Sequence, residues 1–313
     1  MFNLIENPIV VLLYHRVNAL SLDPQLLHIS TDNFHAQMKY LKENCHILAI
    51  EEVSDFIKNK KKLPPNCVYI TFDDGYADNF NQALPILDSL NIQALFSIAT
   101  YHINSPREFW WDDLERIFLI KNNLPKKITL KIKNKSQSFD TSSKINLEKN
   151  YYKTHGILKD MEHEERQKIV AALLREAGLP LEGRPTHRLM SHEEIRQMSA
   201  SPHAVIGAHT HTHTPLSILT YDEQYEEIKR CQSILEGITH KKIKYLCYPF
   251  GKKTDYDNHS IRLVREIGFD IAFANYFQQV HSWSNIYELP RFLVRDWDFE
   301  YFKFQINKFF KFQ

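Results

Sequence analysis

The chain has 313 residues, of which 43% are hydrophobic and 25% charged, and its net charge at pH 7 is +1. This balance is typical of a globular protein with an ample core, and it excludes a disordered chain and an overall basic protein that binds nucleic acid. The first 14 residues contain Glu6 and only a short apolar run at 9–14, which predicts neither a secretory signal nor a membrane span. Four cysteines without close paired spacing predict reduced thiols in a cytoplasmic protein: Cys45, Cys67, Cys231 and Cys247.

Apolar runs of strand length recur along the chain and alternate with helical patterns. The runs lie at residues 9–14, 68–72, 94–99, 204–208, 243–248 and 271–274. Helices are predicted at 32–43 and after the capping-box sequences that begin at Ser191 and Thr220. Near-continuous apolar strands that alternate with helices predict a parallel α/β fold, in which functional groups gather where strands end.

Two segments depart from this alternation. Residues 121–153 are rich in lysine, asparagine and serine, which predicts a solvated insertion such as a hairpin. The alternative is a cap over the substrate, with lysines facing a phosphate or an acidic glycan. Residues 299–313 carry aromatic and aliphatic residues at helical spacing with lysines between them, which predicts an amphipathic helix docked on the core or, alternatively, lying at a membrane surface. We expect one catalytic domain over 1–313 that contains both segments.

Two strand ends carry unusual polar clusters. Asp73 and Asp74 follow the run at 68–72, and His209, His211 and His213 follow the run at 204–208. Two imidazoles and one carboxylate form an open site for a divalent ion, and a second carboxylate supplies a base for the attacking water. Taken alone, Asp-Asp-Gly would indicate an ordinary turn, so the hypothesis of a metal-dependent hydrolase depends on both clusters.

The motifs TFDDGY (71–76), HTHTH (209–213) and YPFG (248–251) together resemble those of the polysaccharide deacetylase family, carbohydrate esterase family 4. The phrases LLYHRV (12–17), GFDIAFAN (268–275) and LPRFLV (289–294) are similar to others in that family. The resemblance implies an α/β fold of the distorted (β/α) barrel type. It implies Asp73 as catalytic base, the backbone N–H of Phe250 as oxyanion donor, and three metal ligands: Asp74, His209 and His213. His211 matches no ligand position.

Two departures from the family pattern concern the catalytic groups. The arginine of the family's third motif, which orients the base, is absent where this chain has Cys247. Arg291 is the candidate replacement, and a surface ion pair is the alternative for that residue. The usual C-terminal histidine motif is also not evident. LLYHRV resembles the branch of poly-N-acetylglucosamine deacetylases with an N-terminal Tyr-His motif, which implies His15 as general acid in preference to His281.

These observations predict a hydrolase that removes the N-acetyl group from an amino sugar in a cytoplasmic, lipid-linked or nucleotide-linked glycan precursor. Zinc is the expected metal, and cobalt, nickel and manganese suit the same ligands. The same groups would also serve an O-deacetylase or a deformylase. Two other classes stay open, a non-haem iron oxygenase and an inactive glycan-binding protein. The expected partner is a glycan and not a nucleic acid, with peripheral contact at the inner membrane face through the C-terminal helix.

Overall fold

The structure is a computed structural model that describes residues 6–132 and 135–312, and it divides into two compact units. The first unit comprises Met1–Ile103 and Met190–Gln313, and the second comprises Asn104–Leu189. The expectation of one catalytic domain over 1–313 stays a prediction. Within the described part of the chain, no helix combines the length and the apolar character that a membrane crossing requires.

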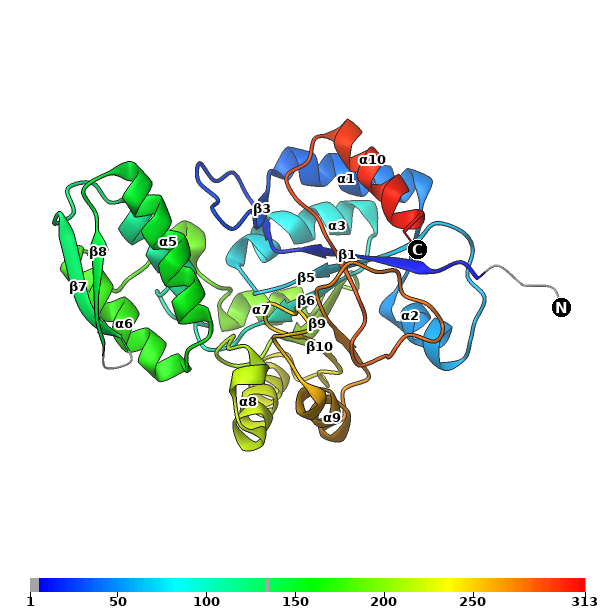
Figure 1. Cartoon of the computed structure of the whole chain (residues 1–313). Helices are drawn as coiled ribbons and strands as arrows, with labels where there is room; N and C mark the ends of the chain where they lie inside the picture. The colour runs from blue at the N-terminus through cyan, green and yellow to red at the C-terminus, as the bar shows by residue number, and fades with distance from the viewer. Residues whose placement is uncertain (1–5, 133–134, 313) are drawn as a thin grey trace. The chain divides into compact units, whose positions relative to one another are not determined.

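The first unit is built on an eight-stranded parallel sheet, in which the strand order is β11-β10-β9-β6-β5-β1-β12 and β4 pairs with β5 (Figure 1). All six predicted runs contain a strand of this sheet, and the α/β fold class is confirmed. The strands are β1 (Ile9–Tyr14), β4 (His46–Ile47), β5 (Cys67–Phe72), β6 (Ala94–Ile98), β9 (Ala204–Ala208), β10 (Tyr245–Cys247), β11 (Ile271–Phe273) and β12 (Phe292–Leu293).

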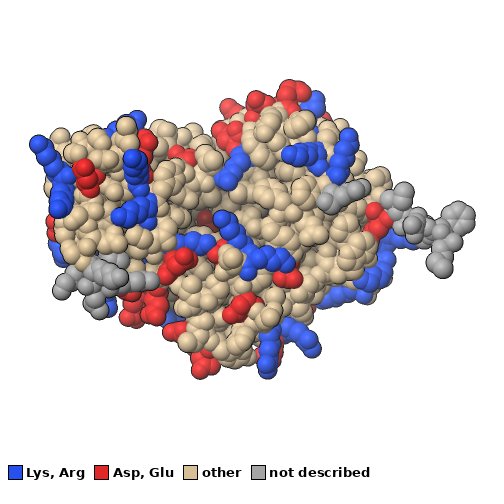
Figure 2. All heavy atoms as spheres, viewed as in Figure 1, with Lys and Arg blue, Asp and Glu red and all other residues tan. Residues whose placement is uncertain are grey.

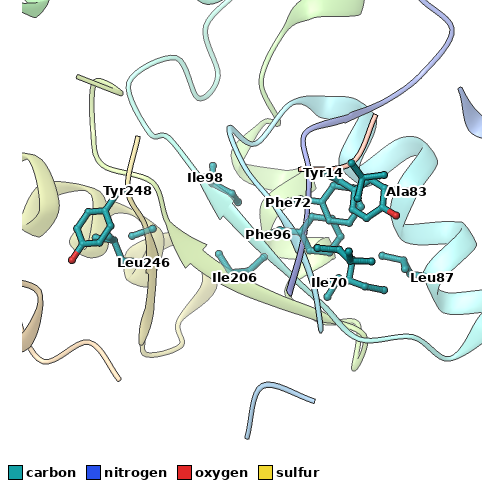
Figure 3. Close-up of a cluster of buried hydrophobic side chains, with 14 of the residues drawn as sticks. Tyr14, Ile70, Phe72, Ala83, Leu87, Phe96, Ile98, Ile206, Leu246 and Tyr248 are labelled. Atoms are coloured by element: carbon teal, nitrogen blue, oxygen red, sulfur yellow. The ribbon is translucent and has the colours of Figure 1, made fainter. Parts of the chain in front are cut away.

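The sheet curls into a distorted (β/α) barrel. Tyr69 on β5 and Phe273 on β11 stack with ring centroids 6.2 Å apart, although three strands separate β5 from β11 in the sheet order. Only a curled sheet brings such strands together on its concave face. On the convex face, Tyr14, Phe72 and Phe96 form a continuous stack under the helices (Figure 3). Every residue of β1, β5 and β6 is buried, as expected for strands covered on both faces.

Helices connect the strands of the first unit. Both predicted capping boxes are present, since the Ser191 and Thr220 side chains accept hydrogen bonds from the backbone N–H groups of Glu194 and Glu223. The helices are α1 (Thr31–Asn44), α2 (Ile50–Lys58), α3 (Leu84–Leu90), α7 (His192–Met198), α8 (Tyr221–Thr239), α9 (Asn258–Ile267) and α10 (Phe299–Phe310). Shorter elements are the strand pair β2 (Arg16–Val17) and β3 (His28–Ile29), the π-helix η1 (Asn79–Ala83) and the 3₁₀ turn η4 (Leu216–Ile218).

The C-terminal helix α10 packs on α1. Tyr40 of α1 makes edge-to-face contacts with Phe299 and Phe302, and the α10 side chains Phe302, Ile306 and Phe309 are buried. On the face of the molecule that Figure 2 shows, basic and acidic side chains of the described residues are intermixed, in keeping with a net charge near zero.

The second unit contains the lysine-rich segment, which forms an antiparallel hairpin and the start of a helix. The hairpin strands pair in register from Lys127 opposite Asp140 to Ile132 opposite Lys135. Trp110, Leu114, Phe118 and Phe139 belong to the core of this unit. Its elements are α4 (Trp110–Glu115), the π-helix η2 (Arg116–Ile120), β7 (Lys127–Ile132), β8 (Lys135–Asp140), α5 (Lys144–Lys159), α6 (His163–Glu176) and the 3₁₀ turn η3 (Pro185–His187).

Candidate active site

The polar clusters predicted at strand ends meet at one edge of the sheet. His15 follows β1, Asp73 and Asp74 follow β5, and His209 follows β9. Because the strands are parallel, their carboxyl ends lie on the same edge, where functional groups of (β/α) folds gather. The fold therefore brings together residues as distant in the sequence as His15 and His209, which are 194 positions apart.

The two adjacent aspartates are separated in space by a tight turn. Asp74 has φ +76° and Gly75 has φ +85°, a left-handed region that disfavours residues with a Cβ. A Cβ at position 75 would lie 2.6 Å from Cγ2 of Ile98, so a larger residue would collide with β6. The Asp73 N–H donates to the Tyr14 carbonyl, and the Asp74 carbonyl accepts from the Ala99 N–H. Bonds to the last residue of β1 and to the residue that follows β6 hold the turn.

The histidine loop, residues 209–213, has two residues with positive φ and is held in place by helix α8. Thr210 and His213 have φ values of +60° and +55°. The Glu227 carbonyl on α8 accepts from the His211 N–H at 3.0 Å. The Glu227 carboxylate accepts from the backbone N–H and the hydroxyl of Thr212, each at 2.8 Å. These contacts fix the path that returns His213 to the side of His209.

Three side chains converge with the spacing of metal ligands. Oδ1 of Asp74 lies 3.4 Å from Nε2 of His209 and 3.2 Å from Nε2 of His213, and the two Nε2 atoms are 3.1 Å apart. Two atoms each about 2.1 Å from a tetrahedral zinc ion are about 3.4 Å apart, so the three atoms match one coordination sphere. The donor set of two imidazoles and one carboxylate also suits a catalytic divalent ion. The residues therefore fit a bound metal.

The surroundings prepare these side chains to bind a cation. Nδ1 of His209 lies 2.8 Å from the Cys247 carbonyl oxygen, a hydrogen bond that leaves Nε2 free to act as a ligand. Burial opposes the ionisation of Asp74, but hydrogen bonds to His209 and His213 outweigh it and hold the pKa of Asp74 well below its usual range. Asp74 is therefore an anion at neutral pH, as a metal ligand must be.

Asp73 is paired with the arginine that sequence analysis selected. Nη2 of Arg291 lies 2.6 Å from Oδ2 of Asp73, and Nη1 lies 2.9 Å from Oδ1, a bidentate arrangement. Burial disfavours the charge on Asp73, yet the charge and hydrogen bonds of Arg291 keep the pKa of Asp73 below its ordinary value. The guanidinium also donates to the Ala274 carbonyl and to the Thr71 hydroxyl. Arg291 therefore forms a buried ion pair with Asp73 and not a surface ion pair, which was the alternative for this residue.

His15 and Phe250 flank the ligand cluster. Burial lowers the pKa of His15, and the nearby charges of Asp74 and Asp73 partly oppose this effect. Nδ1 of His15 is buried without a hydrogen-bond partner among the described residues. Phe250, with φ +58°, packs its ring edge-on against His213 at 4.8 Å between centroids, which puts its backbone beside the cluster.

His211 and His281, the other two histidines considered in the sequence analysis, occupy different environments. Nδ1 of His211 lies 2.9 Å from the Thr100 hydroxyl, and burial lowers the pKa of His211 to about 4. His281 stacks on Trp283, next to Val280, which bridges Ile9 at the amino end of β1. Asp73 lies at the opposite, carboxyl end of β1, and the six residues of that strand span about 17–20 Å. His281 therefore lies far from the ligand cluster.

A second group of candidate ligands lies within the second unit and consists of Asp112, Glu115 and His187. There Arg184 pairs with Glu115 and, through Nη2 at 2.8 Å, with Glu108. Within the group the guanidinium of Arg184 already neutralises Glu115, and it also donates to the backbone carbonyl of Asp112, so these residues belong to an ion-pair network. The cluster at the sheet edge is therefore the better candidate for a metal site.

Sequence reasoning missed Glu227 and the bonds around the Arg291 guanidinium. Glu227 lies inside helix α8 among exposed polar residues, and no local sequence pattern distinguishes it from them as the anchor of the histidine loop. Positive φ values in the structure mark part of the site. Asp74, Thr210, His213 and Phe250 are four of the eleven non-glycine residues with positive φ in the described chain. Strained conformations of this kind cluster at functional sites.

Comparison with known protein sequences gives three consistent findings. The sequence profile of the family described as polysaccharide deacetylase matches residues 60–123 and 136–272, more than half of the chain. The poly-beta-1,6-N-acetyl-D-glucosamine N-deacetylase of Staphylococcus aureus (strain MSSA476) is 23% identical over 309 residues, 95% of this chain and 82% of that protein. The protein YxkH of Bacillus subtilis (strain 168) is 35% identical over 85 residues, which span only 29% of that relative and 27% of this chain.

The solved structure of IcaB from Ammonifex degensii resembles the present fold along nearly its whole length. The TM-score is 0.62 at 18% sequence identity, and the match covers 97% of each chain. At this identity the likeness shows the fold, which is the distorted (β/α) barrel expected from the sequence motifs.

Proposed function

The chain belongs to the polysaccharide deacetylase family, and from that premise we propose that it is a metal-dependent hydrolase that removes the N-acetyl group from an amino sugar. One observation carries the proposal: Asp74, His209 and His213 converge within 3.1–3.4 Å of one another, beside an aspartate that a buried arginine holds in place. The substrate named for the S. aureus relative, an N-acetyl-D-glucosamine polymer, supports an N-acetylated amino sugar as the substrate class.

Asp74, His209 and His213 would hold the metal, for which we propose zinc, with cobalt, nickel or manganese as alternatives. When bound, a divalent ion supplies Lewis acidity, which lets water act as a nucleophile near neutral pH and polarises the acetyl carbonyl. Glu227 and the Cys247 carbonyl keep the histidine ligands oriented through the bonds described above. Such outer contacts determine how well a metal site is preorganised.

Asp73 is the proposed general base. Its carboxylate is ionised at neutral pH because Arg291 lowers its pKa, and the bidentate pair fixes its orientation. Asp73 accepts the proton of the water that adds to the acetyl carbon. The backbone N–H of Phe250 is the proposed donor to the oxygen that gains charge in this step.

His15 is the proposed general acid, as in the family branch with an N-terminal Tyr-His motif. It donates a proton to the sugar nitrogen as the carbon–nitrogen bond breaks, so that acetate and a free amine leave. Its buried and unpartnered Nδ1 and its position after β1 support this role. A hydrolase that cleaves an amide needs this proton because an amine anion is a poor leaving group.

We further propose that the substrate is a cytoplasmic, lipid-linked or nucleotide-linked precursor in glycan biosynthesis. The four unpaired cysteines, of which three are buried, support a reducing compartment. Exposed aromatic residues on α10, among them Tyr301 and Phe304, share this helix with the exposed Lys308 and support peripheral contact with a membrane surface. Cell fractionation and flotation with anionic vesicles would test these two points, and a soluble periplasmic or extracellular protein would contradict them.

The deciding experiment is amine release by the zinc-loaded protein from N-acetylglucosamine oligomers and from lipid-linked and nucleotide-linked N-acetyl sugars. O-acetylated and N-formylated sugars in the same assay would identify an O-deacetylase or a deformylase. We expect release of acetate and amine in equal amounts, with loss of activity on chelation and recovery with zinc. Glycan binding without turnover, or oxygen consumption with iron, would support the binding-protein or oxygenase hypothesis instead.

A further inference from the structure

The peptide that carries His15 is anchored by a side chain from the segment that follows the two aspartates. Nδ2 of Asn79 donates a hydrogen bond to the His15 carbonyl oxygen at 2.7 Å, across 64 positions of sequence. The Asn79 side chain has no exposed surface, so its amide N–H group depends on partners within the protein. Asn79 thus connects the segment of the general base with the segment of the general acid.

The neighbouring Asp78 holds the residues that follow His15. Its carboxylate accepts from the Val17 N–H at 3.2 Å and from Nδ2 of Asn18 at 2.7 Å. It also pairs with Nη2 of Arg16 at 3.0 Å. Asp78 and Asn79 therefore bind four successive residues, 15–18, and a 3.2 Å contact from Nδ2 of Asn79 to Oδ1 of Asp78 links the two anchors.

His15 depends on this support because it lies between two strands of different sheets. β1 ends at Tyr14, and β2, which pairs with β3 and not with the main sheet, begins at Arg16. The ladder to β5 holds Tyr14, whose carbonyl accepts from the Asp73 N–H. The next carbonyl along the chain, that of His15, is held by Asn79.

The stretch DDGYADN, residues 73–79, sets several parts of the site at once. It supplies the base and one metal ligand at its start, and it supplies the anchors of His15 at its end. Asn79 is also the first residue of the π-helix η1, and its carbonyl accepts from the Leu84 N–H. π-helical turns of this kind are frequent at functional sites.

We propose that Asn79 is a positioning residue for the reaction, which acts by fixing the backbone of His15 so that its imidazole meets the leaving nitrogen. The inference rests on the proposed function of His15 as general acid. Proton transfer requires hydrogen-bond reach, about 2.6–3.2 Å between heavy atoms, and a misplacement of about 1 Å costs about 10²-fold in rate. Loss of the Asn79 amide should therefore affect the step that needs a proton more than a step that does not.

The test compares Asn79→Ala and Asn79→Leu, whose side chain keeps the branching of asparagine without its polar atoms, with Asn81→Ala, an exposed asparagine of the same π-helix. We expect both Asn79 variants of the zinc-loaded protein to lose about 10²-fold in kcat for amine release from an N-acetylglucosamine oligomer, with KM nearly unchanged. Turnover of 4-nitrophenyl acetate, whose leaving group departs without a proton, should fall far less. Asn81→Ala should match the wild type in both assays.

A double-mutant cycle separates positioning from a general structural role. If Asn79 acts through His15, His15→Ala with Asn79→Ala should lose no more amide turnover than His15→Ala alone. Additive losses, or equal losses on the amide and the ester, would overturn the inference. Zinc content and unfolding midpoint are measured for every variant, and Asn79→Leu serves if Asn79→Ala does not fold.

A readout that is independent of turnover separates this inference from the proposed function. The imidazole resonances of His15, assigned by comparison with His15→Ala, should shift in Asn79→Leu and stay in place in Asn81→Ala. A wild-type protein that releases no amine would reject the proposed function. An unmoved His15 resonance in Asn79→Leu would reject the anchoring of His15 by Asn79, whatever the activity.

Discussion

Nη2 of Arg291 lies 2.6 Å from Oδ2 of Asp73, although 218 residues separate the two in the sequence. Arg291 immediately precedes β12, and Asp73 follows β5, two strands away across β1 in the sheet order. Both side chains are buried, so water screens their attraction little. The third-motif arginine that this chain lacks at Cys247 thus has a counterpart of the same chemistry from another segment.

Arg291→Ala should remove most of the amide turnover while the metal ligands stay in place. The variant leaves a buried carboxylate without its cation, which typically costs about 3–5 kcal/mol of stability. The pKa of Asp73, which Arg291 holds low, should rise, and the acidic limb of the pH profile of kcat/KM should therefore move to higher pH. Arg291→Lys should lie between, since a lysine cannot form the bidentate pair.

The measurements for Arg291 are the pH profile, the zinc content and the free energy of unfolding. Arg262→Ala, which breaks an exposed pair with Glu266, is the matched control and should change little. A wild-type profile for Arg291→Ala would mean that another group sets the ionisation of the base.

The three proposed ligands should be individually necessary for the metal. Asp74→Ala, His209→Ala and His213→Ala each remove one of three protein donors, so zinc measured by elemental analysis after dialysis should fall far below one equivalent. His211→Ala, in the same loop, is the control and should retain zinc because His211 bonds Thr100. Full zinc occupancy in any two of the ligand variants would contradict the assignment.

Local signals were enough to predict the elements that position the site. The strand runs before Asp73 and His209, and the helix caps at Ser191 and Thr220, depend on neighbouring residues alone, and the structure has them at the predicted places. Parallel strands then require that their polar ends share one edge. Convergence of the aspartates and histidines therefore followed from spacing and topology.

Contacts that depend on the course of distant loops could not be predicted in this way. The carboxylate of Glu227 meets Thr212, and the amide of Asn79 meets the His15 carbonyl, only because two separate segments pass at hydrogen-bond distance. Neither residue differs in type or spacing from asparagines and glutamates on exposed surfaces. In the second unit, likewise, the hairpin was predicted from local sequence, but the ion-pair network around Arg184 depends on distant segments and was not.

Asp73→Asn should retain zinc and lose most of its turnover. The amide is nearly isosteric with the carboxylate but accepts no proton at neutral pH, and general base catalysis is worth about 10²–10⁴-fold. kcat for amine release, with zinc content as control, measures the loss. Near-normal turnover would assign the base to another residue, and retained oxygen-dependent turnover would favour the oxygenase hypothesis.

His155 should make the protein less stable as the pH falls. Burial, with the charge of Lys159, lowers the pKa of His155 to about 4, so the unfolded chain binds a proton that the folded chain does not between about pH 6.5 and pH 4. As far as His155 is concerned, the free energy of unfolding has its full value above pH 6.5 and falls by about 3 kcal/mol towards pH 4.

His155→Phe keeps a ring against Trp110, which lies 4.8 Å from His155 between centroids, and it removes the titrating group. The free energy of unfolding of the variant, measured by urea denaturation from pH 8 to pH 4, should fall less steeply than that of the wild type. His192→Phe, at an exposed position, is the control. Parallel curves for the wild type and His155→Phe would mean that His155 is protonated equally in both states.

His15→Ala should separate amide hydrolysis from ester hydrolysis. The leaving amine of an N-acetyl sugar must be protonated for the carbon–nitrogen bond to break, and the protonated form of His15 can supply that proton. The phenolate of an aryl acetate departs without one. We therefore expect a loss of about 10²–10⁴-fold in amine release, a much smaller loss with 4-nitrophenyl acetate, and an unchanged zinc content.

The alternative for His15 is a purely structural histidine beside the buried end of β1. Its replacement would then lower the unfolding midpoint and reduce both activities together. His281→Ala is the matched control: this residue stacks on Trp283 at the opposite end of β1, so neither activity should change. Equal loss on the two substrates in His15→Ala would reject the acid role, and a selective amide loss in His281→Ala would move that role to His281.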